Sequence, residues 1–260
     1  MGSMFDFKNA EDFKEKCGYV IDGKWYPRVT KIVEVKAKPA LYFFYGEAAS
    51  YKAAKEITEN SAKEGTLIHE IVEKFLIGEK PEIPETIRPA VNSFLNFIEE
   101  KNIHVDGEFV EKRIFHPVHR YAGTIDALAL IDGKFGVLDI KTSQAIYRDY
   151  NLQTSAYIEA LLSELPNLET RWILRIDQIK KCFKCGATMR PKGGRNKIRR
   201  GRTLPCPGEE HEWSDLTGAT EIQEFPFWKN DFEAFLGAKK LWEWENINWL
   251  KQTGYLVGGD

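Results

Sequence analysis

Apolar residues recur at helical spacing in four long stretches of the chain. A helical period places residues three and four apart on one face, which can then pack against a core. Gly78 and Pro81 follow the first stretch, and both residue types end helices. A shorter, polar helix is expected before a hairpin turn at Asp22-Gly23. The long helices are predicted over residues 40–76, 84–102, 148–165 and 230–252.

Between the second and third of these helices the pattern changes to short apolar or alternating runs, which are typical of strands. Asp132-Gly133 joins two of these runs and is the strongest hairpin signal in the chain. The order of helices, a meander, a helix and a further strand predicts an α/β fold with a mixed central sheet flanked by helices. The predicted strands are residues 108–116, 120–131, 134–142 and 170–179.

The two strands around Asp132-Gly133 carry charged residues where core residues are expected. If these two residues form the loop, Asp126 lies opposite Asp139, and Lys141 points to the same face. If the loop shifts by one residue, Asp126 lies opposite Lys141 and diagonal to Asp139. Both registers gather the three charged side chains on one face of the ribbon.

The residues next to these charges are apolar on both faces of the ribbon, as at Ile125, Leu128 and Leu138. Such strands belong at the centre of a sheet, where unpaired charges are rare. Opposed carboxylates repel each other, but a divalent cation between them reverses that cost, and Mg²⁺ and Mn²⁺ prefer oxygen ligands. The pattern therefore indicates a metal site beside Lys141. The alternative is a half-exposed hairpin with a surface ion pair between Asp139 and Lys141.

Four short motifs, in this order along the chain, resemble those of the PD-(D/E)xK nucleases and of their RecB-like branch. "GTID" and "LDIKTS" are similar to the signature that names the superfamily. "QTSAY" in the following helix is similar to the QxxxY motif of that branch, and "EGTLIHEIVEKFL" is similar to its histidine-bearing helix. The likeness covers residues 27–162 and extends to the mitochondrial genome maintenance exonucleases, which degrade single-stranded DNA. It implies a restriction-endonuclease-like core.

The resemblance also implies a ligand set for a catalytic Mg²⁺ or Mn²⁺ ion. His69, Asp126, Asp139 and the backbone carbonyl of Ile140 would bind the metal. Lys141 would orient or activate the attacking water and stabilise the charge that develops on the phosphate. Taken alone, a helical histidine such as His69 is more often an ordinary core or surface residue. The zinc-protease motif H-E-x-x-H lacks its second histidine here.

Five further positions are assigned to the site by the same resemblance. Glu111 matches the acidic position on the preceding strand and would bind a metal-bound water. Gln153 and Tyr157 lie four residues apart on one helix face and would support Lys141 and the DNA strand, although alone they would suggest only an amphipathic helix. Thr30 and Lys31 would contact phosphate, and the alternative for them is the plain start of a strand.

Three of the four cysteines gather late in the chain, around a polar and Gly-rich segment. Cys182, Cys185, Cys206 and His211 have the order of two ligand pairs of a tetrahedral zinc site. So short a segment cannot bury a core, and a metal would have to fold it. The resemblance to RecB-like nucleases implies an alternative, a [4Fe–4S] cluster held by Cys17, Cys182, Cys185 and Cys206. Free thiols are the remaining possibility.

The same segment is strongly basic, although the whole chain has a formal net charge of only −2. Residues 180–202 hold ten Lys or Arg residues and no acidic residue. A local patch of this kind favours phosphate binding, and the absence of aromatic residues from residues 190–202 favours backbone over base contacts. The expected DNA-binding residues are Arg195, Lys197, Arg199, Arg200 and Arg202.

The organisation that we expect is a nuclease core over residues 4–180, a zinc-ribbon-like insertion over 181–215 and a helical completion of the core over 216–260. The first three residues resemble a cloning remnant. The expected activity is that of a metal-dependent DNA exonuclease or end-processing nuclease on single strands or frayed ends, with exonuclease favoured over endonuclease. The alternatives are an iron–sulfur nuclease of the CRISPR-adaptation type and a catalytically silent DNA-binding adaptor.

The composition adds three expectations about the setting of the protein. No apolar run is long enough to span a membrane, and the first residues contain no secretory signal. The cysteine pattern does not resemble a secreted disulfide framework. We therefore expect an intracellular protein that acts as a monomer on DNA, without association with a membrane.

Overall fold

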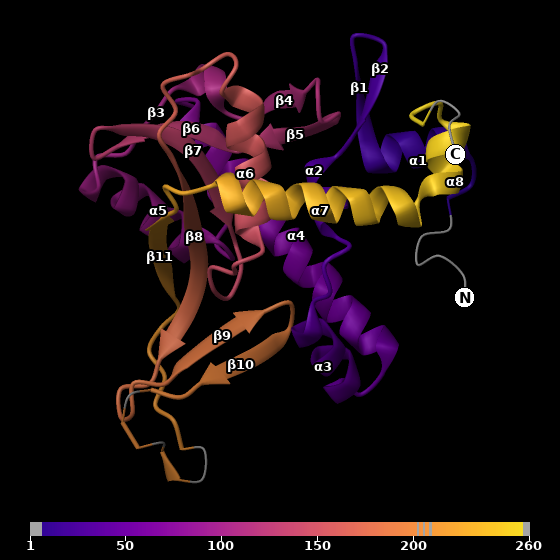
Figure 1. Ribbon diagram of the computed structural model, residues 1–260. Coiled ribbons are helices and arrows are strands. Elements are labelled where there is room, and N and C mark those ends of the chain that lie inside the picture. The colour runs from indigo at the N-terminus through magenta and orange to yellow at the C-terminus, as the bar shows by residue number, and fades with distance from the viewer. Residues whose placement is uncertain (1–6, 202, 205, 208–209, 257–260) are drawn as a thin grey trace.

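A mixed sheet of seven strands forms the centre of the structure, a computed structural model that describes residues 7–201, 203–204, 206–207 and 210–256 (Figure 1). The strands follow the order β10-β9-β8-β7-β6-β3, and β11 pairs with β8 as well. The pair β7–β8 is parallel and all other pairs in this sheet are antiparallel. The strands are β3 (His104–Val105), β6 (Ala127–Ile131), β7 (Lys134–Lys141), β8 (Thr170–Lys181), β9 (Thr188–Lys192), β10 (Arg195–Arg199) and β11 (Thr217–Glu224).

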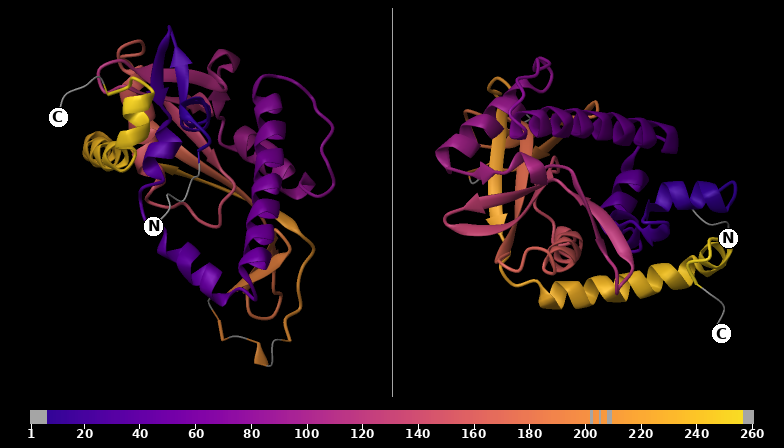
Figure 2. Two further views of the ribbon diagram at one scale, coloured as in Figure 1. Left: turned by 90° about the vertical axis from the view of Figure 1, so that its right-hand side faces the viewer. Right: turned by 90° about the horizontal axis from the view of Figure 1, so that it is seen from above.

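Helices cover both faces of the sheet, as the sequence pattern predicts (Figure 2). The stretch predicted as one helix over residues 40–76 forms two, α3 (Pro39–Glu47) and α4 (Tyr51–Leu76), because Ser50 caps α4 by accepting a hydrogen bond from the Ala53 N–H at 3.1 Å. The stretch over 230–252 also divides in two. The remaining helices are α1 (Ala10–Cys17), α2 (Val29–Val33), α5 (Arg88–Glu100), η1 (Gly107–Phe109), α6 (Tyr150–Leu161), α7 (Lys229–Glu245) and α8 (Ile247–Gln252).

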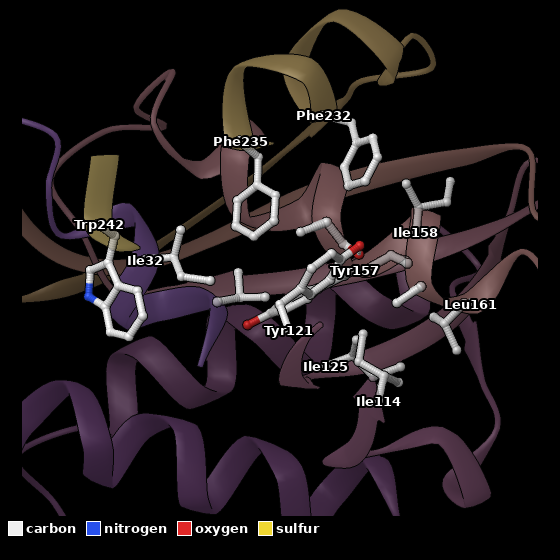
Figure 3. Close-up of a cluster of buried hydrophobic side chains, with 14 of the residues drawn as sticks. Ile32, Ile114, Tyr121, Ile125, Tyr157, Ile158, Leu161, Phe232, Phe235 and Trp242 are labelled. Atoms are coloured by element: carbon white, nitrogen blue, oxygen red, sulfur yellow. Dashed lines mark hydrogen bonds between the residues drawn. The ribbon is translucent and has the colours of Figure 1, made fainter. Parts of the chain in front are cut away.

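Two apolar cores lie on the two faces of the sheet. On one face, α4 and α5 pack over residues such as Leu138 and Ile140. On the other, α6 and α7 pack over Val137 and its neighbours, and Figure 3 shows this core around Tyr121. Successive residues of β7 thus enter opposite cores, which is why the hairpin sequence is apolar on both faces.

The β6–β7 hairpin has the first of the two registers considered. Ile131 pairs with Lys134, so Asp132 and Gly133 form the loop, with φ of 50° and 79°. The predicted strand over residues 120–131, however, is broken at Asp126 into β5 (Tyr121–Ile125) and β6. β5 leaves the central sheet and pairs with β4 (Lys112–His116). Asp126 therefore occupies a corner and is not a ladder partner of Asp139.

Several segments differ from the sequence prediction. Residues 29–33 form a short helix, α2, whereas the hairpin expected at Asp22-Gly23 is present as β1 (Gly18–Ile21) and β2 (Lys24–Pro27). The basic insertion contains the hairpin β9–β10, and the segment expected to be a helical completion begins with strand β11. No helix within the described ranges combines the length and the apolar character that crossing a bilayer requires.

Candidate nuclease and metal sites

The carboxylate of Asp139 is the buried centre of the first candidate site. Its Oδ2 lies 2.6 Å from Nζ of Lys141, on the face of β7 that packs against α6. Its Oδ1 accepts a hydrogen bond of 3.1 Å from Nε2 of Gln153, which lies 3.0 Å from Oη of Tyr157. Burial raises the pKa of Asp139 to about 6, although Lys141 opposes the shift. The structure brings these four predicted residues together.

A glycine lets this arrangement form. A Cβ at Gly123 would collide with the ring of Tyr157, so the tyrosine can lie flat against β5 only because position 123 has no side chain. This contact gives the glycine of "GTID" a packing role. It joins that motif to the tyrosine of "QTSAY", which is far away in the sequence.

Asp126 reaches the same site from the corner between β5 and β6. Its Oδ2 accepts a hydrogen bond of 2.5 Å from the backbone N–H of Ile140, the residue between Asp139 and Lys141. Burial raises the pKa of Asp126, against the opposing effect of Lys141. Because the predicted strand is broken at Asp126, the carboxylate of this residue turns towards the backbone of β7.

Glu111 lies next to this corner, although not in a strand as expected. It precedes β4, has a left-handed backbone with φ of 52°, and donates its N–H to the carbonyl of Asp126 at 3.1 Å. Burial raises its pKa to about 7, and the nearby charges of Glu73 and Asp126 act in the same direction. Crowded acidic groups such as these hold protons in the absence of a cation.

His69 and Glu73 are one turn apart on α4 and complete this acidic region. Burial, together with the charge of Lys141, lowers the pKa of His69 to about 4, so its imidazole is neutral at pH 7. Glu73 was not predicted as a site residue. Its signal is the spacing of four from His69, because residues four apart share a helix face.

A pocket of about 550 Å³ opens between α4, the end of β7 and strand β9. His69, Glu73, Ile140 and Lys141 line it, but so do Arg190 and Lys192 from the insertion. Thr30 and Lys31 do not line this pocket. They lie on α2, where Lys31 is 3.0 Å from Glu34, so the structure does not bring the predicted phosphate contacts of α2 to the site.

One face of the β9–β10 hairpin carries five cations, and we call it the basic ribbon. Arg195 pairs with Lys192 and Lys197 pairs with Arg190, and side chains of paired residues point to the same side. The period of two adds Arg199 to that face, within 3.4 Å of Gln144. The basic ribbon therefore consists of Arg190, Lys192, Arg195, Lys197 and Arg199.

The basic ribbon contacts the segment that directly follows β7. Nζ of Lys192 and Nη2 of Arg190 donate to the carbonyl of Thr142 at 2.6 Å and 2.9 Å, one residue beyond Lys141. Neither cation was predicted as a site residue. The sequence feature that could have indicated them is their spacing of two, which places both side chains on one face of a strand. Arg200 is exposed beyond the end of β10, and Arg202 lies outside the described residues.

A second candidate site consists of Cys182, Cys185, Cys206 and His211. Their ligand atoms all lie within 4.8 Å of one another, and no other group of His, Cys, Asp and Glu in the described ranges is gathered as tightly. Burial opposes ionisation of Cys182, but hydrogen bonds from the Cys185 backbone and from His211 lower its pKa to about 6. Such a Cys₃His group can hold a metal ion.

Cys17 does not belong to this group. It is buried with Phe13 and Trp25 in the core that α7 covers, and burial raises its pKa to about 11. α1, which ends at Cys17, and the insertion lie in different parts of the molecule (Figure 1). The structure therefore does not assemble the four-cysteine set of the iron–sulfur alternative.

Comparison with known proteins adds little to this geometry. No protein-family model matches the chain, and no curated protein matches it. Among solved structures, the fold is similar to the crystal structure of a putative exonuclease from Eubacterium rectale, with a TM-score of 0.42 and 11% identity over 100% of this chain and 89% of that chain. A likeness of this size assigns neither a family nor an activity to this chain.

Proposed function

We propose that this protein is a metal-dependent deoxyribonuclease of the PD-(D/E)xK type and its RecB-like branch, which hydrolyses phosphodiester bonds in single-stranded DNA or at frayed ends. The observation that carries the proposal is the convergence of Asp126 and Asp139 on the segment that ends at Lys141, which lines a pocket together with further cations. A simple ion pair would need only two of these groups. A phosphate substrate and a divalent cation use all three.

The donor set fits a hard divalent cation. Asp139 is fully buried, and apart from the ion pair with Nζ of Lys141 its Oδ2 has no partner among the described residues. Asp126 offers a second carboxylate, His69 a neutral imidazole and Ile140 a backbone carbonyl, and all these ligand types suit Mn²⁺ or Mg²⁺. When bound, the ion would polarise the phosphate and acidify a water molecule.

Lys141 supplies the positive charge on the protein side. Burial favours its neutral form, but Asp139 and Asp126 outweigh that effect and raise its pKa, so it stays protonated. It therefore acts as a donor to the phosphate or the attacking water and not as a base. Gln153 donates a hydrogen bond to Asp139 and another to Tyr157, and these contacts fix the orientation of the Asp139 carboxylate. Glu111 would position a water molecule on the acidic side of the site.

The second site would hold a structural zinc ion. Its four ligands leave no open position for a substrate, which is typical of structural zinc. Folding of the insertion would then present the basic ribbon to the sugar–phosphate backbone of DNA. Elemental analysis tests this assignment: one zinc per chain supports it, whereas iron, with visible absorbance from the purified protein, contradicts it.

The activity is tested with end-labelled linear and circular single strands and with duplexes of the same sequence. We expect cleavage of linear single strands with Mg²⁺ or Mn²⁺ and none when both ions are omitted. The circle should resist cleavage if the enzyme requires an end. Cleavage of the circle would make the protein an endonuclease. Binding of DNA without cleavage in any of these metals would instead identify a silent adaptor with the same fold.

A further inference from the structure

Helix α3 exposes an unusual number of aromatic side chains. Its sequence, "PALYFFYGE", contains no buried residue. Tyr42 and Phe43 are 66% and 71% exposed, and Tyr51, the first residue of α4, is 72% exposed. Aromatic side chains gathered on one surface mark binding sites more often than scattered ones do. α3 therefore contributes little to the core and presents a surface for a ligand.

The rings of this surface are ordered among themselves. Tyr45 stacks on Tyr51 with the ring centroids 5.6 Å apart and the planes 24° apart. Phe44 lies 5.5 Å from Tyr45 in an edge arrangement. We call Phe44, Tyr45 and Tyr51, the three rings that contact one another, the aromatic platform.

The aromatic platform adjoins the tip of the basic ribbon. The guanidinium of Arg195 lies over the ring of Phe44, 5.1 Å from its centroid, and 3.5 Å from Glu47 at the end of α3. Figure 1 shows α3 beside the turn between β9 and β10. A cation of the ribbon is thus already stacked on the platform.

The ribbon itself is held firmly against α4. Gly193, in the β9–β10 turn, has a φ of 64°, and a Cβ there would collide with Oγ of Ser61 and the carbonyl of Ile57. Only glycine permits this close approach. The basic ribbon extends from the platform to Lys192 and Arg190, which line the pocket beside Lys141. Aromatic rings, cations and the candidate catalytic site therefore form one continuous surface.

We propose that the aromatic platform stacks the unpaired bases of a single strand whose phosphates lie on the basic ribbon. The combination of exposed rings with a row of cations complements a ligand that is both a polyanion and aromatic. Unpaired nucleic acid meets that description, whereas the bases of a duplex are stacked on each other. The inference rests on the proposed nuclease function and specifies how the substrate strand is selected.

The test compares two ligands of equal charge, oligo-dT and an abasic deoxyribose-phosphate oligomer. Every protein also carries Asp139→Asn and no chelator is added, so that no strand is cut and the insertion keeps its metal. The variant is Tyr45→Ser/Tyr51→Ser, which removes the stacked pair of rings, and circular dichroism checks that the protein remains folded. The control is Phe227→Ser, another highly exposed aromatic residue, at 89%, away from the platform. We expect the double variant to bind oligo-dT about tenfold more weakly, with unchanged affinity for the abasic oligomer and an unchanged salt slope.

The alternative results separate this inference from the proposed function. Equal oligo-dT affinity in variant and parent overturns the platform, while cleavage by the protein with Asp139 intact would still support the nuclease. An equal loss of affinity for both oligomers would show that α3 acts only through charge or folding, and would also overturn the inference. If the variant loses sedimentation with anionic lipid vesicles but keeps its oligo-dT affinity, the platform binds a lipid surface instead. No binding of any DNA by the parent would contradict the proposed function itself.

Discussion

The two candidate metal sites of this protein are built in opposite ways. The four ligands of the Cys₃His site come from one segment and already lie within 4.8 Å of one another. Little apolar surface surrounds them, since the buried cluster there consists of Cys182, Cys185 and Ala187. The carboxylate site draws its residues from α4, the β5–β6 corner, β7 and α6, and two large cores hold these elements.

The difference indicates what each metal would do. The insertion has almost no core, so the binding energy of its metal would be folding energy. The carboxylate site folds from its own hydrophobic contacts and balances its charges without a metal. Lys141 neutralises Asp139, and the pKa of Glu111 rises to about 7. A metal at the Cys₃His site would hold the insertion together, and a metal at the carboxylate site would perform chemistry.

The largest effect on cleavage is expected from removing the charge of Asp139 or of Lys141. Asp139→Asn and Lys141→Ala should each lower the cleavage rate by about a thousandfold or more, because each removes a group that stabilises charge at the phosphate. Circular dichroism should still show a folded core. Asp132→Asn, in the exposed turn of the same hairpin, is the matched control. Near-normal cleavage by either site variant would refute the assignment.

The sequence predicted local features of these sites well. Asp132-Gly133 predicted the β6–β7 hairpin. The sequence left two registers open, and both place Asp139 and Lys141 on one face. The Cys₃His group follows from spacings within one segment. Both features depend on backbone geometry over a few residues, which a single sequence contains.

Features that depend on tertiary contacts were missed. The break at Asp126 arises because its carboxylate bonds to the Ile140 N–H across the sheet. Lys192 and Arg190 reach Thr142 only because β9 continues the sheet beyond β8. The insertion therefore lines the pocket, whereas its charge pattern predicted only a separate DNA-binding surface.

A second prediction concerns the Cys₃His site and its dependence on metal. Cys185→Ser should release about one zinc per chain and unfold the insertion. Because Arg190 and Lys192 would then no longer hold the carbonyl beside Lys141, cleavage should fall together with DNA affinity. Zinc content, cleavage rate and salt slope are the measurements. Cys17→Ala, a cysteine outside the group, should keep its metal, and metal loss from that variant would restore the four-cysteine alternative.

His69 should affect the choice of metal more than the fold. An imidazole softens a site of oxygen ligands and favours Mn²⁺ over Mg²⁺. His69→Ala should therefore need about tenfold more Mn²⁺ for half-maximal cleavage, with a smaller change for Mg²⁺. Metal titrations of the cleavage rate measure both values. His104→Ala, at an exposed histidine, is the control. An unchanged metal requirement would make His69 an ordinary core residue.

The smallest predicted effect is a pH dependence that links the two regions through Lys192. Burial lowers the pKa of Lys192 to about 8, and Arg190 on the same strand acts in the same direction. Glu64 on α4 and Asp177 on β8 oppose the shift. A bound phosphate would raise this pKa. Above pH 8, where the lysine of the free protein is mostly neutral, DNA binding is therefore coupled to uptake of a proton. Affinity should accordingly be highest below pH 8 and fall as the pH rises above it.

Two substitutions isolate this lysine from every other titrating group. Lys192→Arg keeps its charge at all these pH values, and Lys192→Met never has one. Between pH 7 and pH 9, the parent's DNA affinity should fall by up to about tenfold relative to Lys192→Arg at moderate salt, which is the order of one phosphate contact. Lys192→Met should bind weakly throughout, and the parent should approach it at pH 9. Identical pH profiles for the parent and Lys192→Arg would show that Lys192 carries no phosphate, and that the basic ribbon meets DNA only beyond the pocket.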